Sequence, residues 1–358
     1  MKVAIIGAGL AGLCCAHELE RHGITPVIYE RNGFIGEPYP HVTVVVNVSH
    51  RPIKDSLEYY RSMNIDVAPL YKINKLVHNS PNRTMVVTGN NLGYSFLYTK
   101  DKESFKYQVY SKLKKTEVLL NKPGDYRELM KVYDHVVIAT GTYNYPQELG
   151  IWQPWLKAFA RGALVLGDFD PSSVVMWINK DYCKNGYAYM SFYSDKKASI
   201  VLVVPDVNEN EIDRYWELFL YTEELKYTIV EEFKVDHNSG YAYPRIVDNL
   251  IFVGNAGGGV DPFLGFGHLN AVTMGVAAAR TIAEGKDYEK QIKSLMDKNL
   301  QMRELRKAFN KLNNNHYDKL LAFMGAPGIK NIIYHSPLNV AQVGSIMSNL
   351  LFKKGSTK

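Results

Sequence analysis

The chain has 358 residues, of which 46% are hydrophobic, and a formal net charge of +6 at pH 7; this length can bury a large core and predicts two subdomains. Its basic residues are dispersed, with modest concentrations in residues 286–319 and 353–354, whereas a nucleic-acid-binding protein would interleave basic and aromatic residues on one face. No apolar run reaches the ~18–20 residues of a membrane-spanning helix. The dispersed positive charge indicates a solvated surface, with binding to an anionic membrane or an anionic substrate as the alternative.

The first predicted elements form a dinucleotide motif. A short apolar strand, Val3–Ile6, runs into the pattern G-x-G-x-x-G, and a helix over residues 10–22 follows. The first glycine permits the tight turn, the second lets the backbone approach a pyrophosphate, and the third lets the helix pack close to the strand. The start of the helix directs unpaired N–H groups and a positive dipole end at phosphate. The expected cofactor contacts are Gly7, Gly9, Leu10, Ala11 and Gly12.

Glu30 provides the acidic residue that this motif needs. A second parallel strand over residues 25–30 ends in Glu30, at the separation where a carboxylate accepts hydrogen bonds from a ribose 2′-hydroxyl. Because its charge would repel a 2′-phosphate, the site suits FAD or NAD and disfavours NADP. Arg31 is counted with it among the expected cofactor contacts. The alternative is an ordinary glycine-rich turn with a surface glutamate.

The next segments alternate strands and helices. We expect, in order, a loop over 34–40, a strand over 41–48, a helix over 55–64 that begins near Asp55 and Ser56, a β-hairpin over 72–88 with its turn at 79–82, an amphipathic helix over 102–115 and a strand over 117–120. A strand over 133–141 then has an aspartate at its head and Ala-Thr-Gly at its end, which is typical of a strand that passes beneath a dinucleotide. Further expected cofactor contacts are Val118, Ala139, Thr140 and Gly141.

Residues 160–235 differ in character from the segments before them. Four β-like stretches, over 162–168, 174–178, 186–193 and 198–205, precede a helix over 208–222 and a strand over 227–235. An antiparallel sheet with a helix on one side fits this pattern and is typical of a substrate-binding insert.

A second glycine cluster over residues 249–259 repeats the order of strand and glycines and leads into a helix of small residues. A nicotinamide dehydrogenase needs only the first cluster. A protein that holds an extended FAD needs both, one for the pyrophosphate and one for the ribityl–flavin end. The pair of clusters therefore predicts FAD as the cofactor.

The cysteines indicate the redox compartment. Cys14, Cys15 and Cys183 are the only three, and their spacing forms neither a disulfide framework nor a zinc site. We therefore expect no metal and a reducing, cytoplasmic location. We also expect no signal peptide, because the first strand begins two residues after Met1.

The second cluster contains, in order, Gly254-Asn255-Ala256, Pro262, Gly265-Phe266-Gly267 and a small-residue helix over 271–283. This order resembles the geranylgeranyl reductase family, within the larger group of flavoproteins that includes p-hydroxybenzoate hydroxylase. In that family a strand ends in Gly-Asp-Ala and is followed by a proline, a Gly-x-Gly and a helix of small residues. The resemblance covers residues 1–32, about 85–141, and 240–285.

Three departures from the family pattern bear on the substrate. Asn255 stands where the family usually has an aspartate, and residues 38–41 (Pro-Tyr-Pro-His) replace a loop that often carries arginine and cysteine. Phe266 and His268 stand in place of a frequent Glu-Gly pattern. The last two departures lie where substrate and flavin would meet, so the resemblance carries over better for fold and cofactor than for substrate.

The resemblance implies an α/β fold, in which a Rossmann-like FAD-binding domain (GR2-type) carries an inserted antiparallel β-sheet substrate domain and a C-terminal helical segment. The FAD-binding domain would comprise residues 1–160 and 236–285, the substrate domain 161–235 and the helical region 286–358. The flavin contacts that it implies are Gly254, Asn255, Gly265, Phe266, Gly267 and His268. The helix that begins near His268 would direct its N–H groups at the flavin N1–C2=O.

For activity, the resemblance implies that reduced FAD passes a hydride from N5 to a carbon–carbon double bond of a geranylgeranyl-type isoprenoid lipid. His268, Tyr241 and Tyr189 are the candidate proton donors, His268 because of its unshifted pKa, although a structural or cofactor-contact role is the favoured interpretation of each. One alternative is a flavin-dependent monooxygenase of the p-hydroxybenzoate hydroxylase type. Another is a flavin-bearing redox-sensing or binding protein without turnover. No second G-x-G-x-x-G exists for NAD(P)H, so we expect either transient NAD(P)H contact or a ferredoxin-like electron donor.

The carboxyl-terminal segment has two interpretations. We expect a helix over 286–321, a break at 327–328, and a further helical segment over 329–352. From residue 339 onward this segment has one apolar face and a basic end. It would either close over the core of the FAD-binding domain or lie on a membrane as a peripheral contact, since a lipid substrate would have to be taken from a bilayer.

Overall fold

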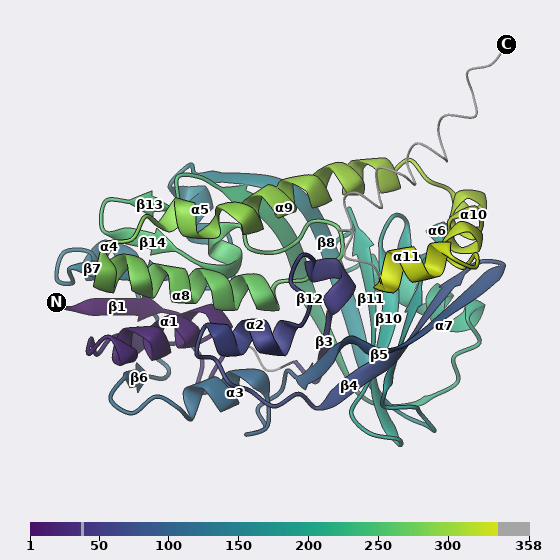
Figure 1. The fold of residues 1–358 in the computed structure, drawn as a ribbon, viewed down its shortest axis with the longest axis horizontal. Helices are drawn as coiled ribbons and strands as arrows, with labels where there is room; N and C mark the ends of the chain where they lie inside the picture. The colour runs from purple at the N-terminus through teal and green to yellow at the C-terminus, as the bar shows by residue number, and fades with distance from the viewer. Residues whose placement is uncertain (37–38, 336–358) are drawn as a thin grey trace, which may run out of the picture.

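The computed structural model describes residues 1–36 and 39–335. Two β-sheets lie side by side along the long axis of the molecule, and the amino terminus is at the outer end of the first (Figure 1). The predicted carboxyl-terminal segment from residue 339 onward lies outside the described residues.

The first sheet has six strands in the order β13-β14-β7-β1-β2-β6. All neighbours pair in parallel except β13 and β14, which are antiparallel. The strands are β1 (Val3–Ile6), β2 (Val27–Tyr29), β6 (Glu117–Leu119), β7 (His135–Ile138), β13 (Ile246–Val247) and β14 (Leu250–Phe252). This central parallel sheet confirms the predicted Rossmann-like α/β domain, which is built from the start of the chain and from the return after residue 240.

Helices cover both faces of the first sheet, as a parallel sheet requires. Val3 and Ile5 belong to the core cluster with α1 (Leu10–Arg21), α8 (His268–Glu284) and α9 (Tyr288–Phe309). Ala4 and Ile6 point to the opposite face and pack with the short helices α4 (Tyr126–Leu129) and α5 (Asn144–Glu148). The alternation along one strand thus places it between two apolar layers.

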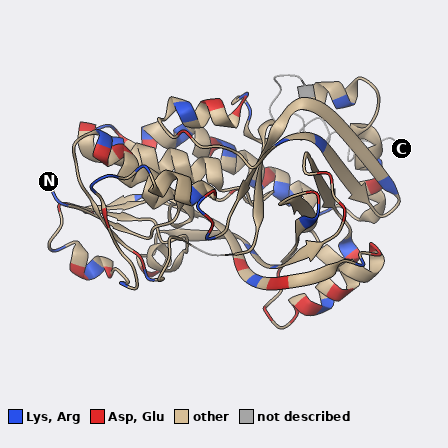
Figure 2. Cartoon of the chain, turned by 90° about the horizontal axis from the view of Figure 1, so that it is seen from below, with Lys and Arg blue, Asp and Glu red and all other residues tan. Residues whose placement is uncertain are grey.

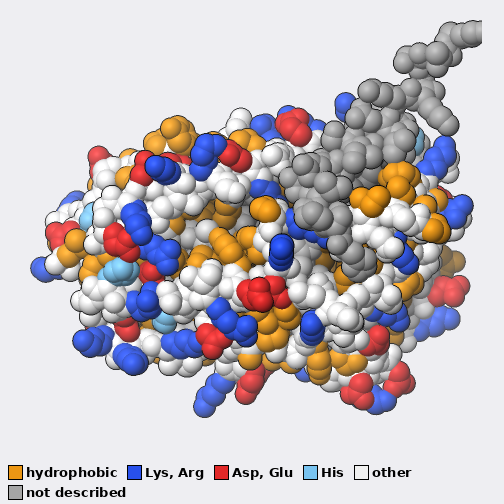
Figure 3. Space-filling view, in the orientation of Figure 1, with side chains coloured by type: hydrophobic (Ala, Val, Ile, Leu, Met, Phe, Trp, Pro, Cys, Tyr) orange, Lys and Arg blue, Asp and Glu red, His pale blue; other side chains and the backbone are white. Residues whose placement is uncertain are grey.

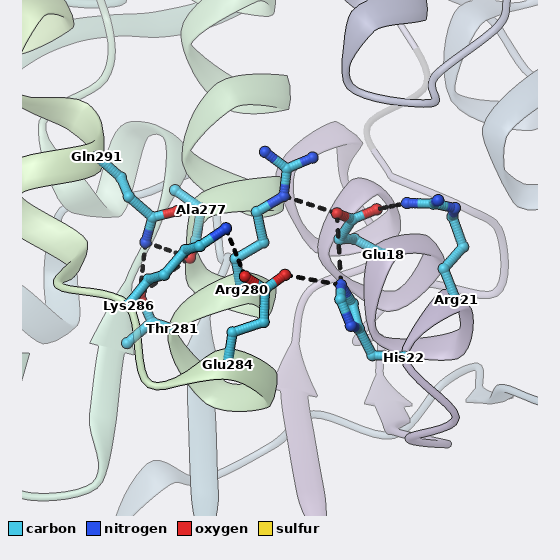
Figure 4. Close-up of polar contacts among 9 residues, drawn as sticks. All are labelled: Glu18, Arg21, His22, Ala277, Arg280, Thr281, Glu284, Lys286 and Gln291. Carbon is cyan, nitrogen blue, oxygen red and sulfur yellow. Dashed lines mark hydrogen bonds and ion pairs between the residues drawn. The ribbon is translucent and has the colours of Figure 1, made fainter.

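Helices α1 and α8 approach each other closely because Gly275 has no side chain at the crossing. A Cβ at Gly275 would lie 2.3 Å from the carbonyl oxygen of Ala11. Nearby, the carboxylate of Glu18, 1% exposed, accepts hydrogen bonds from Arg280 at 2.7 Å and from Arg21 at 2.6 Å (Figure 4). This buried ion pair joins the first helix of the chain to a helix more than 250 residues later.

The second sheet has eight strands in the order β12-β8-β11-β10-β9-β4-β5-β3. Its neighbours are antiparallel except β4 and β9, which are parallel. The strands are β3 (Val42–Val46), β4 (Tyr71–Ser80), β5 (Arg83–Leu97), β8 (Trp152–Leu166), β9 (Ser173–Trp177), β10 (Tyr187–Phe192), β11 (Lys197–Pro205) and β12 (Thr228–Ala242). The predicted hairpin over 72–88 is present, with Ser80 paired to Arg83 across its turn.

The second sheet draws strands from segments on both sides of the predicted domain boundaries. Strands β3, β4 and β5 lie within residues 1–160, which are predicted for the FAD-binding domain, and they belong to the second sheet. The reason is the parallel pairing of Ser173–Trp177 with residues 75–79 of β4, which attaches the early hairpin to the inserted strands. Strands β8 and β12 also run through the predicted boundaries at 160/161 and 235/236.

The remaining helical segments are η1 (Asn47–His50), α2 (Ser56–Ser62), α3 (Phe105–Tyr110), α6 (Lys180–Cys183), α7 (Ile212–Thr222), η2 (Gly254–Gly257), α10 (Asn314–Met324) and α11 (Ile329–His335). The helix predicted over 102–115 is shorter, because the chain turns after Tyr110. The helix predicted over 286–321 is two helices, since Asn313 and His316 form a capping box that begins α10.

The described surface carries charges of both signs. Lys and Arg are interspersed with Asp and Glu over both sheets (Figure 2), and hydrophobic side chains lie between charged ones on the face that carries α8 and α9 (Figure 3). This is the distribution expected of a solvated surface. Among the described residues, no helix combines the length and apolar character needed to cross a membrane.

Candidate functional site

One cavity of about 710 Å³ is lined by both sheets. We call its two parts the dinucleotide end and the sheet end. The dinucleotide end is lined by Gly7, Gly9, Leu10, Ala11, Glu30, Arg31, Ala139, Thr140, Gly141, Gly254 and Asn255. The sheet end is lined by side chains of β3, β4 and β9–β12 and of the carboxyl-terminal helices, including Val44, Leu76, Val174, Met176, Tyr187, Tyr189, Val203, Val235, Phe309, Leu321 and Tyr334. Gly265, Phe266, Gly267 and His268 also line the cavity.

The three glycines of the first motif have different roles. A Cβ at Gly7 would lie 2.4 Å from the carbonyl oxygen of Ala139, and one at Gly12 would lie 2.2 Å from that of Gly7. A Cβ at Gly9 would meet no protein atom closer than 4.0 Å, and its φ of −77° suits any residue. Gly7 and Gly12 are therefore required by the protein's own packing, whereas Gly9 leaves space for a ligand.

The start of α1 has the features of an anion-binding site. Its N-cap residue is Gly9, which has no side chain to accept hydrogen bonds from the first N–H groups of the helix. These groups and the positive end of the helix dipole lie at the dinucleotide end, where Leu10 and Ala11 line the cavity. The arrangement fits a pyrophosphate.

Glu30 lies at the end of β2 and is 4% exposed. Its Oε2 accepts a hydrogen bond from the N–H of Ala8 and its Oε1 one from the N–H of Asn32, both at 2.9 Å. The carboxylate thus fixes the glycine loop while it lines the cavity. A carboxylate has lone pairs beyond these two bonds, so a ribose hydroxyl can still donate to it.

Asn255 supplies an unused acceptor at the dinucleotide end. Its Nδ2 donates to the carbonyl of Gly141 at 2.8 Å, which fixes the amide, while its buried Oδ1 has no hydrogen-bond partner in the described residues. Buried polar atoms without partners are rare in proteins. A hydroxyl of the ribityl chain is a donor that would satisfy this oxygen, so the residues present fit FAD.

His268 begins α8, whose N-cap, Gly267, again has no side chain to cap the helix. Its Nδ1 lies 3.3 Å from Oγ1 of Thr43, and its ring contacts Tyr98 edge-on at 5.4 Å. Burial lowers the pKa of His268 to about 4. The unshifted pKa on which its assignment as a proton donor depended is therefore corrected: at neutral pH the ring is uncharged.

Tyr189 lies in the sheet end and is hydrogen-bonded to His41. The Tyr189 hydroxyl is 3.0 Å from Nε2 of His41, whose Nδ1 is 3.1 Å from Oγ of Ser199. Burial raises the pKa of Tyr189 well above 10. Burial, together with repulsion from His268 when that ring is protonated at low pH, lowers the pKa of His41 to about 3. The sequence had shown His41 only as the end of the 38–41 loop, where the chain departs from the family it resembles.

Three predicted site residues do not line the cavity. Val118 packs against the core cluster of the first sheet, and Gly12 lies against Gly7. Tyr241 stacks on Trp155 at 5.3 Å and lies beneath the guanidinium of Arg245. Tyr241 therefore packs against Trp155 and Arg245 and is not among the residues that line the cavity.

The amino-terminal part of the chain matches a known family. Residues 1–153 match the model of the pyridine nucleotide-disulphide oxidoreductase family. Over 91 residues the chain is 31% identical to a 15-cis-phytoene desaturase from Synechococcus elongatus, a match that covers 23% of this chain and 19% of that relative. The chain thus shares only a minor part of that relative's length.

Solved structures resemble the whole chain. A geranylgeranyl bacteriochlorophyll reductase-like protein from Thermoplasma acidophilum superposes with a TM-score of 0.77, covering 99% of this chain and 96% of that one. A flavin-dependent brominase has a TM-score of 0.68 with 99% coverage of both chains, and a tetracycline destructase 0.62 with 98% and 97%. All three are 15% identical to this chain, and they show the fold. In that fold and in the match over residues 1–153, the chain is similar to flavin-dependent oxidoreductases.

Proposed function

We propose that this relative of FAD-dependent oxidoreductases binds FAD and reduces carbon–carbon double bonds of a geranylgeranyl-type isoprenoid lipid. The observation that carries the proposal is the single cavity that joins the dinucleotide end to an apolar sheet end. A flavin held by the first would border a chain-like apolar substrate held by the second.

The chain's own residues would hold FAD at defined points. The start of α1 at Gly9 would bind the pyrophosphate, Glu30 the adenosine ribose, and Asn255 the ribityl chain. When bound and reduced, FAD supplies a hydride. The N–H groups at the start of α8, beside His268, would stabilise negative charge at the flavin N1–C2=O.

The sheet end supports an apolar substrate. Val44 and Leu76 pack in one apolar cluster with Leu321 of α10, and these residues line the cavity together with Met176. Such walls exclude water and retain a hydrocarbon by burial of its surface.

Tyr189 is the candidate that would supply the proton for the second carbon. Its phenol stays protonated because burial raises its pKa, and His41 and Ser199 extend a hydrogen-bonded chain behind it. His268 is uncharged at neutral pH and serves better as a contact to the cofactor.

The test is a comparison under anaerobic conditions. Purified holoprotein, reduced chemically, is mixed with geranylgeraniol, and the lipid is analysed by mass spectrometry. We expect a gain of two hydrogens per reduced bond, and Tyr189→Phe to slow turnover on the order of 100-fold or more without loss of flavin. Absence of reduction with any polyprenyl lipid would contradict the proposed function.

The fold also supports a flavin-dependent monooxygenase, since the brominase and the destructase share it. Oxygen consumption that depends on an added aromatic compound, with a hydroxylated product, would favour this alternative. A protein that binds flavin but is reduced by no nicotinamide, ferredoxin or dithionite would instead be a redox-sensing or binding protein. NAD(P)H or a ferredoxin-like protein as electron donor, a cytoplasmic location and peripheral membrane contact are part of the proposal.

A further inference from the structure

Arg306 is a buried cation that forms no ion pair with any of the described residues. It lies on α9, lines the sheet end of the cavity, and is 6% exposed. Its Nε has no hydrogen-bond partner, and no acid within the described residues forms an ion pair with it. Burial of a guanidinium costs free energy unless the group is paired. Arg306 therefore needs an anionic partner that the described residues do not supply.

Two further polar atoms near Arg306 have no partner either. The Nε2 of His237, on β12, and the hydroxyl of Tyr317, on α10, are buried and unpaired. Both interact electrostatically with Arg306: burial and, to a smaller extent, the charge of Arg306 lower the pKa of His237, and Tyr317 acts on the pKa of the guanidinium. Arg306 and His237, which line the cavity, and Tyr317, which interacts with Arg306, thus form a group of polar side chains with unpaired atoms.

Asp261 interacts electrostatically with Arg306 but does not pair with it directly. Its carboxylate, 6% exposed, accepts a hydrogen bond from the N–H of Phe263 at 2.7 Å and forms no ion pair with Arg306. Lys298 acts on the same carboxylate, so two cations share one acid. The sequence from 336 to 358 holds no Asp or Glu, so no acidic side chain of that segment can fill the role.

We propose that Arg306 is a specificity-determining residue, which binds an oxyanion, carboxylate or phosphate, carried by the apolar substrate of the cavity. The inference rests on the proposed function only in taking the sheet end as the substrate site. Arginine suits this role because its planar guanidinium donates two parallel hydrogen bonds to a carboxylate or phosphate. Around it, Phe309, Leu305 and Tyr187 line the cavity and would contact the apolar chain.

The test compares three probes with the same chain: dodecanoate, dodecyl phosphate and dodecanol, titrated by calorimetry into full-length holoprotein. We expect at least one of the two anions to bind roughly 10- to 100-fold more tightly than the alcohol, and the tighter anion identifies the headgroup. Arg306→Met, which keeps the length of the side chain, should abolish this preference and leave dodecanol binding unchanged.

The same variant separates binding from structure. Because Arg306→Met removes an unpaired buried charge, it should raise Tm or leave it unchanged, with flavin content and flavin midpoint potential as in the wild type. The matched control is Arg303→Met, one turn earlier on α9, where the guanidinium stacks on Trp155 outside the cavity; it should keep the anion preference.

Each contrary result overturns the inference. Equal affinity for alcohol and anions would show that no oxyanion is bound, and loss of stability or of flavin in Arg306→Met would show a structural role. A shifted midpoint potential with unchanged probe binding would show that Arg306 acts on the flavin. Since the assay measures binding without turnover, an anion preference in a protein that reduces no lipid would contradict the proposed function and support this inference.

Discussion

Gly9 is the residue at which loss of cofactor can be separated from loss of fold. Its backbone conformation and the open space around it allow a side chain, whereas its position at the start of α1 is where a pyrophosphate would lie. We expect Gly9→Val to yield a folded protein whose FAD affinity falls on the order of 100-fold or more. Flavin absorbance and a thermal unfolding curve of the purified variant measure both properties.

The control for this variant is Gly12→Val. A Cβ at Gly12 would lie 2.2 Å from the backbone oxygen of Gly7, so this variant should lose the fold together with the flavin. If Gly9→Val retained wild-type flavin content, the pyrophosphate would not lie at the start of α1.

Glu30 combines two tasks that substitutions should reveal separately. Glu30→Ala removes an acceptor for FAD, which we expect to weaken FAD binding by about 1.5–3 kcal/mol. It also leaves the N–H groups of Ala8 and Asn32 without their acceptor, which should lower the free energy of unfolding by about 1–3 kcal/mol for each group. Glu30→Gln keeps one oxygen acceptor and should cost less in both respects. Urea unfolding of the apoprotein measures the second effect alone, and FAD titration measures their combination; wild-type values in both would make Glu30 a bystander.

At the same scale, the sequence predicted glycines better than buried polar residues. Gly7, Gly9 and Gly12 were predictable because their spacing reflects local backbone geometry, which a short motif contains. His41 and Arg306 were not, because their importance depends on Tyr189, His237 and the cavity, which come from distant segments.

At the scale of elements, the contact between α1 and α8 depends on one buried acid. Burial alone would raise the pKa of Glu18, but hydrogen bonds from Arg280 and Arg21 lower it. The carboxylate therefore stabilises the fold above the pKa of an ordinary glutamate, and this stabilisation is lost as the pH falls through the lowered pKa of Glu18. Glu18→Gln should reduce the free energy of unfolding by about 3 kcal/mol, the lower end for breaking a buried pair, because Arg280 is 28% exposed and can reach water.

The control for Glu18→Gln is Lys293→Gln. It breaks the pair of Lys293 with Asp297 on the surface of α9, where both side chains are at least half exposed, and should change the free energy of unfolding by no more than about 0.5 kcal/mol. Equal effects of the two substitutions in urea unfolding would show that the Glu18 network does not hold the helices together.

Elements were predicted where their signals are local. The hairpin over 72–88 and the N-cap of α2 at Asp55 follow from turn and capping residues. The sheet to which β4 belongs does not, since its parallel pairing with β9 joins segments about 100 residues apart. The break between α9 and α10 has a local signal, the capping residues Asn313 and His316. We did not predict the break because the apolar periodicity continues through residue 321.

At the scale of the whole molecule, the cavity between the two sheets gathers an unusual share of the histidines. The chain has ten histidines. Four of them line the cavity, namely His41, His78, His237 and His268, and a fifth, His50, packs against the cavity residue Phe266. Burial lowers the pKa of each to about 3 or 4. At neutral pH all five are uncharged, which suits an apolar substrate.

This grouping predicts acid lability. In the unfolded chain each imidazole binds a proton below about pH 6.5, whereas in the folded protein it does so only near pH 3–4. Between these values the unfolded state binds more protons, so the free energy of unfolding falls with falling pH, by roughly 1.4 kcal/mol per pH unit for each histidine. Asp261 has the opposite effect on the free energy of unfolding, because burial raises its pKa to about 6. Its stabilising contribution is lost as the pH rises through 6. One acid cannot offset five histidines.

Urea unfolding of the apoprotein at pH 7.5, 6.5, 5.5 and 5.0 measures this slope. We expect His78→Gln to reduce it, because one of the five imidazoles is removed while a glutamine can still hydrogen-bond to Tyr334, the present partner of His78 at 3.1 Å. His135→Gln, at the start of β7 and outside the cavity, should leave the slope unchanged. A free energy of unfolding that stays constant from pH 7.5 to 5.0 would mean that water or another group already lets these histidines charge in the folded protein, and the cavity would then be too polar for the lipid that we propose as its substrate.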